Sequence, residues 1–297
     1  MKYNFVKNDL IEIIMPPLIG DCIMTFPLIN HLKLQFKVTL VCNEYVFETV
    51  KYLQYPLKLK LLSADNLKDK IIIDFLSNEE SALYIKISKP KLSVGFKDGY
   101  WNYDLELKQP SEFNSLSATS IFLYVLDVLG LDSNINIDFS CSRQWQFHNQ
   151  QKILIAPSAG NISRCYSIED FILLCKKLGN NNVAFILGPG DKSILSSIPL
   201  DFEIIKTSSL KETIGILSKA RMVIASEGGF MHIAASYGIP LIGLFKIASI
   251  KNWFPYENKY QIGIGDGINN YNNIPKIQMD IELINETVEK IYESLEN

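Results

Sequence analysis

The stretch Met222–Phe245, MVIASEGGFMHIAASYGIPLIGLF, decides the fold class of this chain. The β-branched run MVIA predicts a strand and Gly228-Gly229 a turn, and FMHIAASYG then predicts a short helix. The run PLIGLF predicts a second strand. Two apolar strands joined by a helix are typical of a parallel βαβ unit, so we expect an α/β protein.

The turn after the first of these strands is suited to an anion. Glu227 falls where the strand should end, and Gly228 and Gly229 let a ligand approach the backbone without a Cβ in the way. The first N–H groups of the following helix lack intrahelical partners and carry the positive end of the helix dipole, so a diphosphate would be stabilised there. A plain βα connection is the alternative, because glycine-rich turns are common.

His232 belongs to the first turn of the same predicted helix, five residues after Glu227. This spacing predicts an imidazole beside the anion site. A histidine that is simply packed among small residues is the alternative.

The rest of the chain repeats this alternation of strands and helices. Near-continuous apolar strands separated by helices predict parallel sheets covered on both faces. In the first half the expected strands are IEIIMP, VTLVC, KIIIDF and KLSVGF, and the expected helices are FPLINHLKLQF and SATSIFLYVLDVLG. In the second half the expected strands are KILIAPS, VAFILG, FEIIKT, RMVIAS and PLIGLF.

The weakest periodicity lies in the Asn-, Ser- and Gln-rich stretch Asp132–Gln151, which predicts a domain boundary. We expect one domain over residues 1–147 and a second over residues 148–297. The second should end in an amphipathic helix, DIELINETVEKIYESLE. Two further helix starts have the spacing of a capping box, Ser167 with Asp170 and Ser209 with Glu212.

Composition narrows the class of protein. A chain of 297 residues with 47% hydrophobic content can bury two medium cores. Its 5 cysteines form no C-x-x-C pair, which disfavours a disulfide framework or zinc ribbon and suggests a reducing cytoplasm. No secretory leader or membrane-spanning run is visible, so we expect a soluble protein. A net charge of −3 argues against a nucleic-acid partner.

One local stretch, Lys86–Lys97, carries four lysines and no acid. It allows a peripheral contact with anionic lipid at the inner face of the cytoplasmic membrane, or with a phosphorylated glycan. A solvated surface with lysines on an edge strand is the favoured interpretation.

Four stretches in the same order along the chain resemble glycosyltransferase family 9, the lipopolysaccharide heptosyltransferases. Glu227–Pro240 is similar to the family's D-[ST]-G-x-x-H-x-A-A-x-x-G-x-P signature, and Ile19–Lys33 to its LGDxxxTxPxxxxLK. Pro157–Phe171 resembles PGAxxxxKxWPxExF, and Leu187–Asp191 resembles GGPxE. The resemblance implies the GT-B fold, with two doubly wound Rossmann-like domains facing a cleft. Residues 1–147 would carry the acceptor side and residues 148–297 the nucleotide sugar.

The resemblance implies that Asp21 is the catalytic base. The residue lies between a predicted strand and the helix expected at Phe26, at the carboxyl end of the strand. Its carboxylate would then point into the cleft and take a proton from the acceptor hydroxyl. An aspartate just before a helix can instead only cap it, and the sequence alone leaves both interpretations open.

Donor binding is assigned by resemblance to the second half. The small-residue turn at Ser158 would hold phosphate oxygens, the guanidinium of Arg164 would neutralise the departing diphosphate, and Gly188-Pro189-Gly190 would turn beneath the base, with Asp191 near the ribose. The expected donor-binding residues are Ser158, Ala159, Gly160, Arg164, Gly188, Gly190, Glu227, Gly228, Gly229, His232 and Lys246.

No metal is expected in this scheme, because the chain lacks H-E-x-x-H and D-x-D motifs and its 3 histidines are far apart. No cofactor is expected beyond the nucleotide-sugar donor, for which the resemblance implies ADP-heptose. The resemblance further implies that the heptose is transferred, with inversion at its anomeric carbon, to a lipopolysaccharide core or related glycan acceptor.

The chain departs from the family pattern at several donor positions. Glu227 stands in place of an aspartate, Gly228 in place of a small hydroxyl residue, and Tyr166 in place of a tryptophan. The stretch Lys246–Ile250 stands in place of a G-P-T-D-P run. Lys246 or Ser249 would have to contact the phosphate in place of the polar residues of that run. Two alternatives therefore stay open. One is a transferase of the same fold with another nucleotide sugar or acceptor, such as a protein or capsule glycan. The other is an inactive relative that binds nucleotide sugar or glycan.

Overall fold

A computed structural model describes residues 9–53, 55–96, 103–108, 116–141, 152–248, 250–254, 256, 258–265 and 278–296. The chain divides into two compact units, Met1–Ser142 and Arg143–Asn297. The boundary expected between residues 147 and 148 lies outside the described residues, as does the division itself. Each unit is described by itself.

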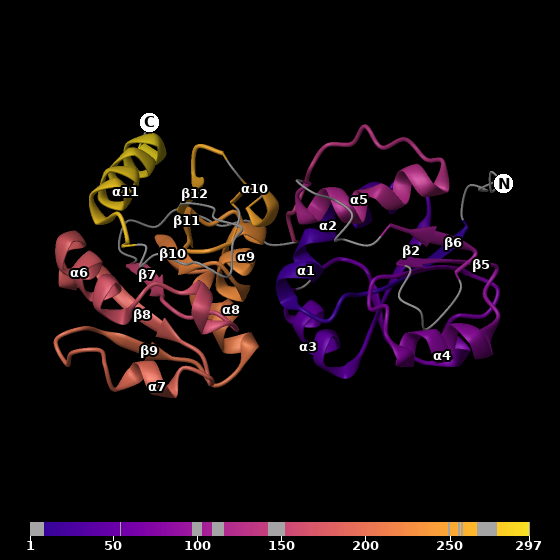
Figure 1. Ribbon diagram of the computed structural model, residues 1–297, viewed down its shortest axis with the longest axis horizontal. Helices are drawn as coiled ribbons and strands as arrows, with labels where there is room; N and C mark the ends of the chain where they lie inside the picture. The colour runs from indigo at the N-terminus through magenta and orange to yellow at the C-terminus, as the bar shows by residue number, and fades with distance from the viewer. Residues whose placement is uncertain are drawn as a thin grey trace. The chain divides into compact units, whose positions relative to one another are not determined.

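The first unit contains a parallel sheet of six strands in the order β3-β2-β1-β4-β5-β6 (Figure 1). The central strand β1 pairs with both β2 and β4, with Ile13 opposite Leu40 and Ile73. The strands are β1 (Leu10–Ile14), β2 (Lys37–Cys42), β3 (Lys58–Leu61), β4 (Ile71–Asp74), β5 (Leu92–Phe96) and β6 (Leu105–Leu107). The prediction of a parallel sheet is thereby confirmed for this half.

The helices of the first unit connect and cover these strands. They are α1 (Ile19–Met24), α2 (Phe26–Leu32), α3 (Glu44–Tyr52), α4 (Glu79–Ser88) and α5 (Ala118–Leu129), with a 3₁₀ turn η1 (Ala64–Asn66). The helix α5 packs against α1 and α2, and Figure 1 shows α2 and α5 side by side. Asn43 and Asn78 cap α3 and α4 by accepting backbone N–H bonds.

Tyr103 fills the core of the first unit. Its ring lies directly over Gly95, where a Cβ would come within 2.4 Å of a ring carbon, and its hydroxyl donates to Asp74 at 2.8 Å. Asp74 also accepts from the N–H groups of Leu76 and Ser77, and burial raises the pKa of its carboxyl. The polar groups at the end of β4 are therefore satisfied within the unit.

The second unit repeats the same strand order, β9-β8-β7-β10-β11-β12, and its sheet is also parallel. The strands are β7 (Ile153–Ala156), β8 (Val183–Leu187), β9 (Ile204–Lys206), β10 (Met222–Ser226), β11 (Leu241–Phe245) and β12 (Gln261–Gly265). The helices and 3₁₀ turns are η3 (Ile162–Arg164), α6 (Ile168–Leu178), η4 (Asn180–Asn182), α7 (Lys192–Leu195), α8 (Leu210–Leu217), α9 (Gly229–Ser236), α10 (Ile250–Trp253) and α11 (Ile281–Glu296).

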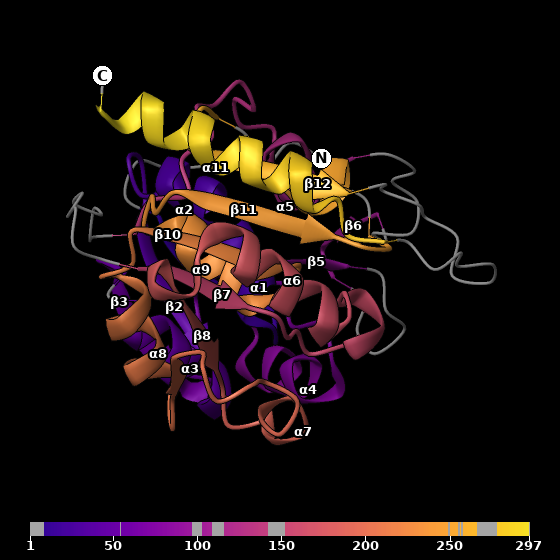
Figure 2. The same cartoon turned by 90° about the vertical axis from the view of Figure 1, so that its left-hand side faces the viewer.

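The predicted carboxyl-terminal helix is confirmed as α11, which packs against α6 (Figures 1 and 2). Its apolar residues Ile284, Val288 and Ile291 are buried in one cluster with Phe171, Leu174 and the apolar residues of β7, β8 and β10. The spacing of these residues places them on one helical face.

Both sheets have the strand order of the doubly wound Rossmann fold, which reverses direction between β1 and β4 and between β7 and β10. Ligands of such sheets bind at the carboxyl ends of the strands on either side of this reversal. The α/β fold class expected from the sequence is confirmed. We therefore expect ligands at the loops that follow β1 and β4 in the first unit and at those that follow β7 and β10 in the second.

The predicted capping boxes differ in outcome. Ser167 and Asp170 form the reciprocal pair at the start of α6. Ser209 caps α8 as expected, but the Glu212 carboxylate accepts from the N–H and hydroxyl of Ser208, one residue earlier. The second site is therefore half of a capping box.

The lysine-containing stretch Lys86–Lys97 covers the end of α4 and strand β5. The prediction of an edge strand here is wrong, because β5 pairs with β4 on one side and β6 on the other. Lys91 forms an ion pair with Asp9 at 3.0 Å. Within the described parts of the chain, no helix combines the length and apolarity needed to cross a bilayer.

Candidate active site

The loops after β7 and β10 meet at the carboxyl edge of the second sheet. These two strands are neighbours, with Ala225 opposite Ala156, and the order of the sheet reverses between them. The hydroxyl of Ser226 donates to the carbonyl of Pro157 at 2.9 Å and fastens one loop to the other. The turn Ser158-Ala159-Gly160 and the pair Gly228-Gly229 therefore lie at one edge of the sheet.

Gly228 is needed for this close approach. A Cβ at this position would lie 3.0 Å from the Cβ of Ala159, so a larger residue would push the two loops apart. Gly229 begins α9 and has nothing within 4 Å of where its Cβ would be, as is also true of Gly160. The space beside Gly229, where α9 begins, is thus open, and the first N–H groups of a helix are the groups that bind an anion.

Arg164 and Glu227 form an ion pair at the same place. The Arg164 guanidinium, at the end of η3, donates from Nη1 to Oε2 of Glu227 at 2.9 Å. The Glu227 side chain is 4% exposed and that of Arg164 is 32% exposed. The buried carboxylate therefore holds the guanidinium while part of the cation still faces solvent, where a second anion can reach it.

Lys246 follows β11 and donates from Nζ to the carbonyl of Cys165 at 3.0 Å. Tyr166 donates its hydroxyl to the carbonyl of Phe245 at 3.5 Å. The loop after β7 is thus fastened to both β10 and β11. The amine of Lys246 therefore lies against the backbone of Cys165, the residue that follows Arg164 in the chain.

Gly188 and Gly190 lie after β8, the strand next to β7. The N–H of Gly188 donates to Oδ2 of Asp191 at 2.7 Å, so this carboxylate closes its own turn. A Cβ at Gly188 would lie 3.8 Å from the ring of Phe230, in the first turn of α9. The turn after β8 therefore lies beside the start of α9, and one Asp191 oxygen is occupied by the turn.

His232 is buried, with 3% of its surface exposed. Its Nδ1 hydrogen-bonds to the hydroxyl of Tyr256 at 2.9 Å, and burial lowers the pKa of the imidazole to about 4. The side chain is thus neutral at pH 7 and bound to a protein hydroxyl. The burial agrees with the alternative of a packed histidine, and a role of this imidazole in donor binding stays a prediction.

Tyr256 and Phe254 were not anticipated from the sequence. Phe245, Phe254, Tyr256 and His232 form a chain of edge-to-face ring contacts, each with centroids 5.8 Å apart. The Phe254 ring lies in a notch made by Gly243 and Gly263, which are paired in register on β11 and β12. The sequence signal that could have revealed these contacts is the recurrence of aromatic residues every few positions after β11. Ser249 lies outside the described residues.

Asp21 belongs to the first unit and lies in the first turn of α1. As expected, the residue lies between β1 and the helix that begins at Phe26, and Ile19–Met24 forms a short helix of its own that was not predicted. Leu18 is the N-cap residue, and no side chain caps this helix. Asp21 is half-buried at the carboxyl end of β1, the strand that borders the reversal of the first sheet.

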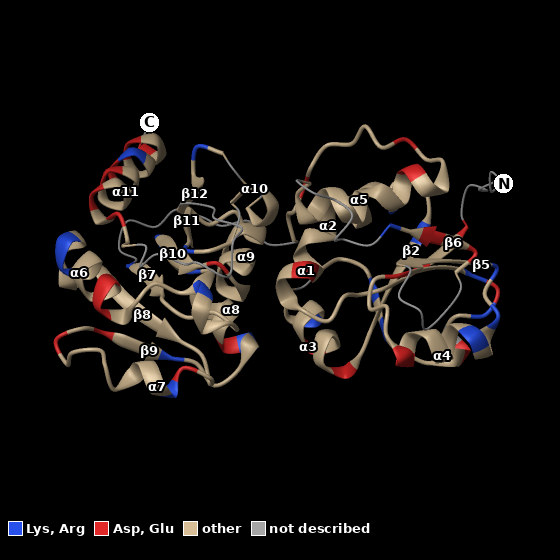
Figure 3. Cartoon of the chain, in the orientation of Figure 1, with Lys and Arg blue, Asp and Glu red and all other residues tan. Residues whose placement is uncertain are grey.

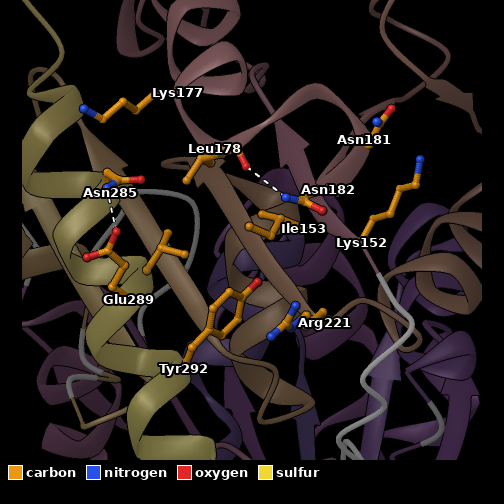
Figure 4. Close-up of a pocket in the computed structure, with 11 residues that line it drawn as sticks. Lys152, Ile153, Lys177, Leu178, Asn181, Asn182, Arg221, Asn285, Glu289 and Tyr292 are labelled. Carbon is orange, nitrogen blue, oxygen red and sulfur yellow. Dashed lines mark hydrogen bonds between the residues drawn. The ribbon is translucent and has the colours of Figure 1, made fainter.

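A cavity of about 430 Å³ lies elsewhere in the second unit (Figure 4). It is bordered by the starts of β7 and β10 and by α6 and α11, so it occupies the amino edge of the sheet. Its cations already have contacts: Lys177 pairs with Glu282, Lys152 with Glu203, and Arg221 stacks on Tyr292 with 3.8 Å between the guanidinium carbon and the ring centroid. The edge with Arg164 and the glycine turns is therefore the stronger candidate.

Metal-ligating residues are not grouped in the described parts of the chain. No three His, Cys, Asp or Glu side chains there are placed to hold an ion. Burial raises the pKa of the thiol of Cys165, the residue after Arg164, so this thiol stays protonated at neutral pH. The chemistry available at this edge is anion binding by Arg164, Lys246 and the amino end of α9.

Comparison with known proteins agrees with this geometry. Residues 91–278 match the sequence model of a protein family described as "Glycosyltransferase family 9 (heptosyltransferase)". The lipopolysaccharide core heptosyltransferase OpsX of Haemophilus influenzae is 22% identical over 209 residues, which cover 62% of this chain and 60% of OpsX. The match thus spans less than two thirds of that relative.

Solved structures share the fold over nearly the whole chain. The family 9 glycosyltransferase of Veillonella parvula superposes with a TM-score of 0.76 at 14% identity, covering 98% of this chain and 99% of the other. The E. coli heptosyltransferase WaaC, solved with ADP, gives a TM-score of 0.70 at 13% identity, covering 95% and 99%. The fold is therefore of the GT-B type, and the chain belongs to glycosyltransferase family 9, the heptosyltransferase family.

Proposed function

We propose that this protein is an inverting, metal-independent glycosyltransferase that moves a heptose from ADP-heptose to a lipopolysaccharide core or related glycan acceptor. The observation that carries the proposal is the Arg164–Glu227 pair, whose Glu227 directly precedes the glycines at the amino end of α9. The family supports a nucleotide-sugar donor, ADP is named with WaaC, and a lipopolysaccharide core acceptor is named for OpsX.

In the proposed reaction the acceptor oxygen attacks the anomeric carbon of the donor from the face opposite the diphosphate. The acceptor proton passes to the Asp21 carboxylate, a new carbon–oxygen bond forms, and the bond to the diphosphate breaks. The electron pair of that bond leaves with ADP. Its charge is neutralised by Arg164, Lys246 and the N–H groups that begin α9.

The remaining assignments follow the same division of labour. Residues 1–147 would bind the acceptor, and residues 148–297 the donor. The turns at Ser158–Gly160 and Gly188–Gly190 would border the diphosphate and nucleoside. We place the protein in the cytoplasm, at the inner face of the membrane where a lipid-linked acceptor would be reached. Nucleic acid is not a proposed partner.

A second candidate is a transferase with a different donor sugar or acceptor. Glu227 favours it, because its carboxylate is engaged by Arg164 and the adjacent residue is Gly228 in place of a hydroxyl residue. An aspartate and a hydroxyl residue at positions 227 and 228 would hydrogen-bond to the sugar, and Glu227 and Gly228 offer it fewer hydrogen bonds. The nucleotide site would remain while the sugar preference changes.

Nucleotide-dependent thermal stabilisation tests the proposal. At a concentration of 100 times its Kd, a nucleotide that binds only the folded protein stabilises it by about 2.7 kcal/mol. We expect ADP to raise the melting temperature more than UDP or GDP. The variant Arg164→Gln should lose most of this shift, whereas Arg221→Gln, a cation at the opposite edge of the same sheet, should keep it. No shift with any nucleotide, or equal shifts in both variants, would contradict the assigned site.

A further inference from the structure

We infer that the cavity at the amino edge of the second sheet binds a small phosphorylated polyhydroxy compound, such as a sugar phosphate. This is the cavity of about 430 Å³ drawn in Figure 4, and its volume is within the range of small-molecule sites. The proposed donor site lies at the carboxyl edge of the same sheet. The cavity is therefore a second site, and the inference does not rest on the proposed function.

The lining of the cavity is basic. Its described charged residues are three cations and one carboxylate: Lys152, Lys177, Arg221 and Glu289. Lys177 belongs to the last turn of α6, and Figure 3 shows this end of the helix as basic and its beginning as acidic. Three cations against one carboxylate favour a ligand with two negative charges, which a phosphate monoester carries at pH 7.5.

Both lysines of the lining have partners that do not prevent a further contact. Lys152 pairs with Glu203 and Lys177 with Glu282, and the four side chains are between 36% and 71% exposed. Ion pairs as exposed as these contribute little to stability, because solvent screens them. An ammonium group has three N–H donors, so a bound phosphate can share it with the glutamate.

Tyr292 supplies the observation that points to a ligand. Its hydroxyl oxygen is buried, and no hydrogen-bond partner for it is present in the described parts of the chain. Burial raises the pKa of this hydroxyl to about 12, so it keeps its proton at neutral pH and can donate. Figure 4 shows the ring reaching from α11 toward Arg221 and Ile153. Buried hydroxyls are nearly always hydrogen-bonded, so we expect a ligand oxygen to accept from this one.

Arg221 is held beside the Tyr292 ring. Its guanidinium carbon lies 3.8 Å from the ring centroid. The ring contacts the face of the guanidinium, whereas a phosphate binds to the N–H groups in the plane of that group. Glu289 accepts from Nδ2 of Asn285 at 3.0 Å, and in the view of Figure 4 it lies on the other side of the Tyr292 ring from Arg221. The guanidinium and the Tyr292 hydroxyl can therefore bind the same phosphate.

Side-chain amides form the uncharged polar part of the lining. Asn181 and Asn182 belong to η4, and Asn285 belongs to α11. The amide of Asn182 is oriented by the bond from its Nδ2 to the carbonyl of Leu178, at 3.2 Å. An amide both donates and accepts hydrogen bonds, as a hydroxyl group does, so amides are suited to a ligand with several hydroxyls. These hydroxyls would extend from the phosphate toward η4 and α11.

Calorimetry at pH 7.5 on the full chain tests the inference with three probes: glucose 6-phosphate, inorganic phosphate and glucose. Glucose 6-phosphate should bind about tenfold more tightly than inorganic phosphate and at least about 30-fold more tightly than glucose. Tyr292→Phe keeps the ring against Arg221 and should weaken glucose 6-phosphate by about tenfold. Arg221→Gln should weaken it by about 30-fold or more. Circular dichroism and the melting temperature without ligand show whether each variant is folded.

Two control variants change similar groups outside the cavity. Tyr260→Phe removes a hydroxyl that donates to the carbonyl of Ser294 at 3.4 Å, in the same unit. Arg164→Gln removes a cation from the opposite edge of the sheet. Both should leave the Kd of glucose 6-phosphate within about twofold.

Four results would overturn the inference. They are no binding of glucose 6-phosphate, glucose binding as tightly, inorganic phosphate binding as tightly, and a Kd that neither Tyr292→Phe nor Arg221→Gln changes. Loss of binding in Arg164→Gln would also overturn it, because the probe would then occupy the proposed donor site. The proposed function is judged separately by the ADP-dependent shift, which Arg164→Gln should lose and Arg221→Gln should keep.

Discussion

The ion pair between Arg164 and Glu227 is expected to be coupled more strongly than a surface pair. The two charges are joined by a 2.9 Å contact, and only one partner is substantially exposed. Unit charges about 4 Å apart attract by about 4 kcal/mol at an effective dielectric constant of 20. Desolvation of the Glu227 carboxylate offsets part of this attraction. We therefore expect a coupling free energy of about 1.5–3 kcal/mol, between surface and fully buried pairs.

A double-mutant cycle measures this coupling. In Arg164→Met the buried Glu227 carboxylate loses its cation, and the free energy of unfolding should fall by about 2–3 kcal/mol. Glu227→Gln removes that charge and should cost about 1 kcal/mol. The double variant should resemble Glu227→Gln alone, because the uncompensated carboxylate is gone. Unfolding in urea at pH 7, followed by tryptophan fluorescence and circular dichroism, gives the four free energies.

A second cycle on Lys177 and Glu282 provides the matched control. This pair has the same 2.9 Å separation in the same unit, but its side chains are 43% and 71% exposed. Its coupling should be below about 0.5 kcal/mol. If Arg164 and Glu227 give an equally small coupling, then the carboxylate does not hold the guanidinium, and the pre-positioned diphosphate site would have to be abandoned.

Three other perturbations have defined outcomes. Asp21→Asn should lower the rate of transfer by about 10²- to 10⁴-fold while the Kd for ADP, from calorimetry, stays within about twofold; unchanged turnover would exclude Asp21 as the base. The pKa of His232 is lowered to about 4, below its unfolded value near 6.5, so its contribution to stability is complete above pH 6.5 and is lost as pH falls toward 4. His232→Gln should therefore flatten the pH dependence of unfolding over that window, by up to about 3 kcal/mol, and an unchanged slope would refute the shift. Gly95→Ala should displace the Tyr103 ring and lower the free energy of unfolding by about 1–3 kcal/mol, whereas Gly215→Ala, with nothing within 4 Å, should not destabilise; equal urea midpoints would contradict this packing.

The centres of both sheets could be predicted from the sequence because their strands are buried on both faces. β8 (VAFIL) and the first four residues of β10 (MVIA) read as unbroken apolar runs, and the structure buries all of these residues. The outer strands β3, β6 and β12 escaped prediction. β3 (KLKL) and β6 (LEL) alternate polar and apolar residues but have only 4 and 3 residues, and β12 (QIGIG) contains two glycines, so none of them shows the continuous apolar run of the central strands.

The location of the candidate site could be predicted, but its contacts could not. Glycine-rich turns after apolar strands identify the carboxyl edge of a parallel sheet, and the loops of Ala159, Gly188 and Gly228 do lie together there. The Arg164–Glu227 pair joins residues 63 positions apart, and no local pattern encodes it. The partner of His232 was equally hidden, because Tyr256 becomes its neighbour only when the segment after β11 folds back.

The seating of Phe254 between two strands constrains how this sequence can change. A Cβ at Gly243 or Gly263 would come within about 3 Å of the Phe254 ring, so neither glycine can acquire a side chain while the ring remains. Conversely, a smaller residue at position 254 would leave a void that two alanines could fill. Positions 243, 254 and 263 should thus covary as a triplet among homologues, with a bulky ring accompanied by two glycines and a small side chain by alanines.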